Sequence, residues 1–235
     1  MSAADAPFWA ECLGSAMLAA ACMGAGAASA SSGRGVGRPA VAAGAAMAAA
    51  VFVTSATGAH VYAPLTIALW GGGADSGESL ARLGGQALGS LLGAGVATVA
   101  VLPWIARADR AELEAALWPR AAARAPLSAA VAVAAAACLA SLVMLRLRVG
   151  ALPFVLAHPA QAALLAGTGV SASVLAFGAA GAVGDPWQPI SGRALSRALP
   201  MSERPPADWR SAWPWPVGIV AGALLAAWAY GALAG

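Results

Sequence analysis

The chain has 235 residues, of which 60% are hydrophobic and 10% are charged, and its mean hydropathy is +0.75. This composition predicts one membrane domain of closely packed helices rich in small residues. The formal net charge of +3 is too small to indicate a nucleic-acid partner. Three cysteines (Cys12, Cys22, Cys138) lie inside apolar stretches and give neither a disulfide framework nor a metal-binding spacing, so we expect no metal and no cofactor.

Six apolar stretches have about the length that crosses a bilayer, roughly 20 residues. A polar connector at 106–126 separates two halves, 8–105 and 127–235, as an internal duplication would. The predicted spans lie at about 8–30, 40–56, 80–105, 127–145, 160–180 and 213–234.

A shorter apolar run at 63–69 follows Gly-Ala-His and ends at Trp70 and three glycines. It is too short to cross a bilayer, so we predict a re-entrant half-helix, which must be surrounded by protein or a water-filled cavity. The polar turn at 75–78 is expected to cap the next helix.

Two of the polar residues inside the predicted spans, Glu11 and Gln86, are candidates for a structural role. Glu11 is one turn into the first span, where a carboxylate is unfavourable unless it is paired or faces a polar interior. It is either buried and hydrogen-bonded or solvated near the interface. Gln86, in the third span, is expected to make an interhelical hydrogen bond rather than to contact a solute.

The connector between the halves contains residues 111–118, which form either an amphipathic interfacial helix or a solvated loop. The fourth span contains no carboxylate. His158, beside a proline near the start of the fifth span, is interpreted as structural.

Residues 57–66 read Thr-Gly-Ala-His-Val-Tyr-Ala-Pro-Leu-Thr. They resemble the first pore loop of the aquaporin family, Ser-Gly-Ala-His-x-Asn-Pro-Ala-Val-Thr, and include His60. The triplet Tyr62, Ala63 and Pro64 stands where the family has Asn-Pro-Ala. Residues 11–15 are similar to the family's Glu-Phe-Leu-Gly-Thr, and 85–89 to its Ala-Gln-x-x-Gly-Ala.

Residues 184–200 look like the family's second pore loop. Ile190, Ser191 and Gly192 replace its Asn-Pro-Ala, and Arg193 matches the arginine that follows. The last span, with Trp213, Trp215, Gly218, Gly222 and Tyr230, resembles the family's sixth helix, and the two glycines are expected to be a close-packing pair.

The resemblance implies an all-α membrane protein with six transmembrane helices, two re-entrant half-helices and an inverted repeat. It further implies that Glu11 accepts hydrogen bonds from the pore-loop backbone. The selectivity filter would consist of Arg193, Trp187, Gly178 and Ala42. Asp185 is close enough in sequence to pair with Arg193.

The implied function is a passive channel for water or a small neutral solute. No catalytic arrangement of side chains is found, and the three glycines at 71–73 are not a phosphate-binding loop because no lysine follows. We therefore predict that the chain is not an enzyme. The alternative, favoured by the replacement of both Asn-Pro-Ala triplets, is a non-conducting structural subunit of a larger membrane complex. Expected partners are the lipid bilayer and either three further copies in a homotetramer or other subunits.

Arginine is unevenly distributed between the two sides that this topology defines. The side bearing the termini has Arg82, Arg146 and Arg148, and the opposite side has Arg34, Arg38, Arg107, Arg110, Arg120, Arg124, Arg193, Arg197, Arg204 and Arg210. The positive-inside rule predicts that the termini lie outside. The expected membrane is the plasma membrane or an organelle inner membrane, such as the mitochondrial one.

Overall fold

The computed structural model describes residues 5–30, 37–105, 126–148, 158–177, 187, 190–191, 194 and 213–234. These residues form helices and short connections and include no strand, which confirms the all-α prediction for this part of the chain. The helices are α1 (Asp5–Ala30), α2 (Gly37–Thr54), η1 (Ser55–Thr57), α3 (Ala63–Gly71), α4 (Ser76–Ile105), α6 (Pro126–Arg148), α8 (Pro159–Phe177) and α11 (Pro214–Ala234).

The start of α4 differs from its predicted position. The helix begins at Ser76, about one turn before the span expected from about residue 80, and Asp75 Oδ1 accepts a hydrogen bond from the backbone N–H of Glu78 at 2.8 Å at its start. The predicted cap is thus confirmed, with the polar turn inside the helix. The predicted interfacial helix at 111–118 lies outside the described residues.

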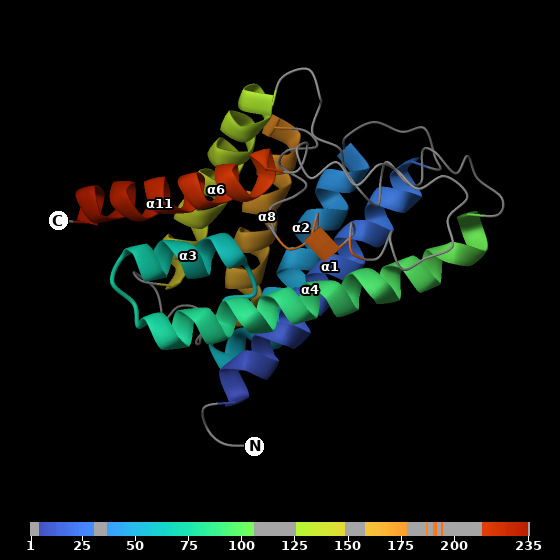
Figure 1. Cartoon of the computed structure of the whole chain (residues 1–235), viewed down its shortest axis with the longest axis horizontal. Helices are drawn as coiled ribbons and strands as arrows, with labels where there is room; N and C mark the ends of the chain where they lie inside the picture. The colour runs from blue at the N-terminus through green and yellow to red at the C-terminus, as the bar shows by residue number, and fades with distance from the viewer. Residues whose placement is uncertain are drawn as a thin grey trace.

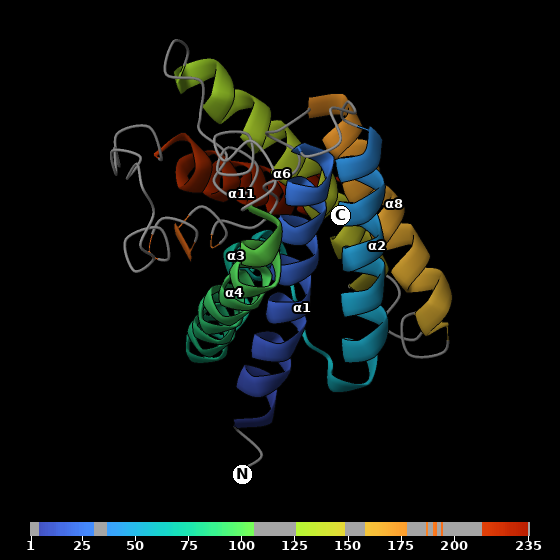
Figure 2. The same ribbon diagram turned by 90° about the vertical axis from the view of Figure 1, so that its right-hand side faces the viewer.

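The long helices pair in the same way in both halves. Helix α1 packs against α4, and α6 packs against α11, whereas α2 packs against α8 from the other half. Helix α1 also contacts α2, as α6 contacts α8, and Figure 2 shows α2 and α8 side by side. This pattern relates one half to the other about the α2–α8 contact.

Glycines allow the paired helices to approach closely. A Cβ added to Gly89 of α4 would lie 2.1 Å from the carbonyl oxygen of Cys12 in α1. In the second half, a Cβ on Gly222 of α11 would lie 2.2 Å from the carbonyl oxygen of Ala134 in α6. Neither position can hold a larger residue unless the helices separate, so the close approach predicted at Gly222 is confirmed.

The contact between α2 and α8 is reciprocal. A Cβ on Gly44 would lie 2.6 Å from the carbonyl oxygen of Gly167, and a Cβ on Gly167 would lie 2.5 Å from that of Gly44. Each glycine therefore meets the other's backbone, which is the self-complementary contact expected at a two-fold axis.

The short helix α3 lies within the bundle rather than on its surface. It contacts α4, α6 and α11, and it lies between α4 and α11 in Figure 1. Its nine residues span about 14 Å, less than half of a bilayer's hydrocarbon core. Ala63, Leu65, Thr66 and Ala68 are buried on several of its faces.

Helix α4 has the reverse of a soluble helix's polarity. Its buried polar residues are Ser79, Arg82, Gln86, Ser90 and Thr98. Apart from Glu78 in the first turn, its exposed large side chains among the described residues are apolar: Leu80, Leu88, Leu91, Leu92, Val96 and Val99. Two stretches of the described helices, Ser76–Ala100 and Pro214–Ala232, have both the length and the hydropathy of a membrane span.

Candidate functional site

The first loop follows α2, which ends at Thr54. Thr54 Oγ1 donates a hydrogen bond to the carbonyl oxygen of Ala50 at 2.6 Å, and one turn of 3₁₀ helix follows. Thr57 Oγ1 donates to the carbonyl oxygen of Thr54 at 2.7 Å. Gly58 then reverses the chain with φ of +68°, a conformation that glycine adopts without a Cβ clash.

Val61 has an unusual backbone conformation, because its φ is +64° although it is β-branched. Such a conformation costs on the order of 1–3 kcal/mol and persists only when its surroundings impose it. Helix α1 imposes it from two sides. The N–H of Val61 donates to Glu11 Oε2 at 2.7 Å, and its carbonyl oxygen accepts from Ser15 Oγ at 3.1 Å.

The Val61 side chain also packs on α1, against Gly14, where a larger residue would have to displace it. A Cβ on Gly14 would lie 2.7 Å from Cγ2 of Val61. One turn of α1 therefore holds Val61: Glu11 accepts a hydrogen bond from its N–H, Ser15 donates one to its carbonyl, and Gly14 leaves space for its side chain.

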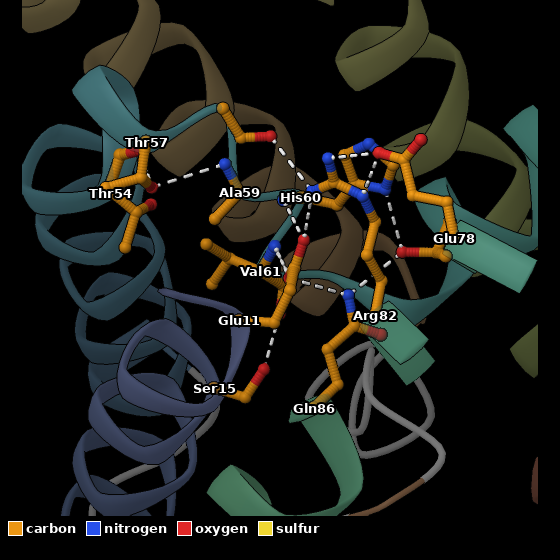
Figure 3. Close-up of polar contacts among 12 residues, drawn as sticks. Glu11, Ser15, Thr54, Thr57, Ala59, His60, Val61, Glu78, Arg82 and Gln86 are labelled. Atoms are coloured by element: carbon orange, nitrogen blue, oxygen red, sulfur yellow. Dashed lines mark hydrogen bonds and ion pairs between the residues drawn. The ribbon is translucent and has the colours of Figure 1, made fainter. Parts of the chain in front are cut away.

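The carboxylate of Glu11 is the centre of the hydrogen-bond network (Figure 3). Its side chain is 0% exposed and accepts four hydrogen bonds. Two come from the backbone N–H groups of His60, at 2.5 Å, and Val61. The others come from Arg82 Nη1 at 2.8 Å and Gln86 Nε2 at 2.9 Å. The resemblance implied that Glu11 accepts from the loop backbone, and two loop N–H groups donate to it.

Arg82 supplies the positive charge that a buried carboxylate requires. Its guanidinium lies between Glu11, at 2.8 Å, and Glu78, at 2.7 Å, and its side chain is 11% exposed. Nη1 also donates to the carbonyl oxygen of Gly58 at 3.1 Å. One arginine thus joins the start of α4, the loop and α1.

Sequence reasoning did not assign this role to Arg82. The available signal was its spacing, because Glu78, Arg82 and Gln86 lie four residues apart and so share one helix face. Because Gln86 was expected to make an interhelical hydrogen bond, this spacing indicates that the Arg82 side chain also faces a neighbouring helix.

Thr66 connects the network to α3. Its hydroxyl accepts a hydrogen bond from Gln86 Nε2 at 2.9 Å and lies 3.0 Å from His60 Nδ1. Gln86 of α4 is therefore joined directly to the first turn of α3, and to the loop before α3 through Glu11.

Tyr62 precedes α3 in an extended conformation, and its carbonyl oxygen accepts from the N–H groups of Leu65 and Thr66 at 3.0 and 3.3 Å. Its side chain is 2% exposed and belongs to the hydrophobic core with Met47 and Leu65. Ala63 and Pro64, the next two candidate residues, are also buried.

The other candidates are only partly described. Trp187 is half-buried, Ile190 is exposed and Ser191 is buried. Gly178, Asp185, Gly192 and Arg193 lie outside the described residues, and Ala42 lies in α2 with its side chain outside them. The described residues contain no group of three His, Cys, Asp or Glu that could hold a metal ion.

This arrangement is suited to holding a structure rather than to catalysis. The donors around Glu11 hold the loop against α1 and α4, and Glu11, the only buried carboxylate among the described residues, is paired with a cation. What the network determines is the position of the first turn of α3, whose leading N–H groups carry a partial positive charge.

Comparison with known proteins supports the fold. No family model matches the chain, and no curated protein matches it in sequence. The chain is similar to the solved X-ray structure of the aquaglyceroporin from Plasmodium falciparum, with a TM-score of 0.79 and 18% sequence identity. The similarity covers 97% of this chain and 96% of that one, so this chain has an aquaporin-like fold along nearly its whole length.

Proposed function

We propose that this chain is an integral membrane protein with six spans and two half-helices, and that it passes a small uncharged solute passively. The reversed polarity of α4 supports a membrane location, because apolar side chains face outward while arginine, glutamine and serine are buried. A water-soluble monomer rarely exposes apolar surface on this scale.

The observation that carries the proposal is the position of α3. A helix of nine residues whose N-terminal end lies inside the bundle spans only about half of a bilayer's hydrocarbon core. Its N–H groups point a positive partial charge into the interior, which disfavours cations and accepts neutral solutes. Water and small polyols are the solutes that this chemistry fits.

For the second loop and the filter we rely on the alignment with the family's motifs. Ile190, Ser191 and Gly192 then stand opposite the first loop. Arg193, Trp187, Gly178 and Ala42 line the constriction, where Gly178 leaves space of the kind found in wider, polyol-type filters and Trp187 narrows it. Asp185 pairs with Arg193.

Osmotic measurements on sealed vesicles test this function. Vesicles with the reconstituted protein should shrink or swell faster than empty vesicles in water and glycerol gradients. Gly178→Trp should return permeability to the empty-vesicle rate by filling the constriction. The matched control is Gly231→Trp in α11, where an added Cβ meets nothing within 4 Å.

Equal permeability of empty vesicles and vesicles holding folded wild-type protein would refute the channel. Equal permeability of both tryptophan variants and the wild type would instead refute the assignment of Gly178 to the constriction.

We further propose a homotetramer in the lipid bilayer. Several helices expose apolar side chains that lipid or neighbouring copies can cover, among them Leu127, Val131, Leu164 and Trp228. Native mass measurement in mild detergent should give four copies, and a stable monomer would contradict this assembly.

A further inference from the structure

The close glycine contacts fix a residue-by-residue register between the two halves. Gly85 and Gly89 of α4 meet the carbonyl oxygens of Phe8 and Cys12, at 2.4 and 2.1 Å from an added Cβ. Gly218 and Gly222 of α11 meet the carbonyl oxygens of Ala130 and Ala134, at 2.6 and 2.2 Å. Both glycine pairs and both carbonyl pairs are four residues apart.

Phe8 and Cys12 of α1 therefore correspond to Ala130 and Ala134 of α6, and Gly85 and Gly89 correspond to Gly218 and Gly222. Continuing the same count along each helix gives the counterparts of the network around Glu11. Glu11 corresponds to Val133, Ser15 to Ala137, Arg82 to Trp215 and Gln86 to Ile219.

These four counterparts are gathered in the structure. Val133, Ala137, Trp215 and Ile219 form a separate cluster of buried hydrophobic residues. The register was fixed by the glycines and not by these side chains, so the cluster is independent support for it. Each of the four polar residues compared is thus replaced by an apolar or aromatic residue in the second half.

The loop sequence changes in the matching place. Aligning residues 62–64 with residues 190–192 puts Pro189 where the first loop has Val61. Proline has no N–H to donate. The second half therefore has a counterpart neither of the Val61 N–H donor nor of its acceptor, the Glu11 carboxylate.

We propose that Val133, Ala137, Trp215 and Ile219 form an apolar seat that holds the second loop, residues 186–190, by packing rather than by a carboxylate. This rests on the proposed aquaporin-like arrangement of the second loop. Trp215 takes the place of Arg82, whose Nη1 donates to the carbonyl oxygen of Gly58. The indole N–H of Trp215 is buried with no hydrogen-bond partner among the described residues. In the loop alignment, the carbonyl that corresponds to that of Gly58 belongs to Pro186.

Cysteine cross-linking tests the seat without measuring transport. In full-length protein with Cys12, Cys22 and Cys138 replaced by alanine, Val133→Cys and Pro189→Cys are combined and exposed to a mild oxidant. A disulfide should form, because such bonds need Cα atoms within about 7 Å. The control joins Pro189→Cys with Val131→Cys, which lies on the same helix and is 62% exposed.

We expect cross-linking of the Val133 pair on the order of tenfold faster than of the Val131 pair, given that reach. Equal rates, or no cross-link in the folded Val133 pair, would overturn the seat. The outcome is separable from the channel. Cross-linking in a protein that does not raise vesicle permeability would support the seat and refute the channel. Permeability without cross-linking would support the channel and refute the seat.

Trp215→Phe gives a second measurement that keeps the ring and removes the N–H. It should lower the thermal unfolding temperature and slow cross-linking of the Val133 pair by several-fold, as expected for a lost buried hydrogen bond. Trp213→Phe, at an exposed position, should do neither. Unchanged stability and cross-linking in Trp215→Phe would show that the indole N–H holds no loop carbonyl.

Discussion

At the scale of single residues, the first loop depends on one carboxylate whose surroundings are entirely donors. Two backbone N–H groups, a guanidinium and an amide converge on Glu11. Removing one partner of a buried ion pair is far more harmful than removing a surface pair, because the remaining charge stays buried without compensation. The conformation of Val61 adds to this dependence, since only contacts with α1 keep its φ positive.

Glu11→Gln is therefore expected to destabilise the protein by about 3 kcal/mol or more. A glutamine has one acceptor oxygen where the carboxylate has two, and its NH₂ group would face other donors. Thermal unfolding in detergent measures the change.

The matched control is Glu78→Gln, at the other end of the same guanidinium. The Glu78 side chain is 56% exposed, so its loss should cost about 0–1 kcal/mol. Similar losses in the two variants would show that the burial of Glu11 contributes nothing.

At the scale of the elements, the helices are held together by backbone contact. Gly85, Gly89 and Gly93 of α4 follow one another at intervals of four residues, and each faces a carbonyl oxygen of α1. This stripe brings α4 close enough for Arg82 and Gln86 to reach Glu11. The polar network therefore depends on the close packing of α1 and α4, because the glycines set the distance between the two helices that the hydrogen bonds to Glu11 require.

Gly89→Ala should separate α1 from α4, because the new Cβ would lie 2.1 Å from the carbonyl oxygen of Cys12. We expect a loss of about 1–3 kcal/mol. Gly95→Ala, also in α4, meets nothing within 4 Å and should instead stabilise the protein by about 0.5–1 kcal/mol. Unfolding curves of both variants in one detergent give the comparison, and a stabilising Gly89→Ala would contradict the close crossing.

At the scale of the whole molecule, the sequence predicted the helices far better than the contacts between them. Apolar length alone located the long helices, and the short run before Trp70 located α3. The partner of Glu11 was missed because Arg82 and Glu11 lie 71 positions apart and no local pattern joins them. The correspondence of the halves was also hidden, because four polar residues of one half are apolar in the other and only the spacing of glycines is kept.

The uneven distribution of arginine predicts how the whole molecule is inserted. The connector at 106–126 and both termini should lie on opposite sides, with the connector on the side that the positive-inside rule assigns to the interior. In sealed vesicles of known orientation, trypsin should cut at Arg107, Arg110, Arg120 or Arg124 only from that side. A terminal tag should be accessible only from the other. Access to both from a single side would contradict the six-span topology.

The reciprocal meeting of Gly44 and Gly167 has a consequence for how such a chain can change. A contact in which each half presents the same surface to the other depends on the residues at that contact. Residues away from it can then differ between the halves, charged around Glu11 and apolar around Val133, while the Gly44–Gly167 contact is kept. The two halves thus share the Gly44–Gly167 contact, whereas a polar network lies between α1 and α4 in the first half and an apolar cluster lies between α6 and α11 in the second.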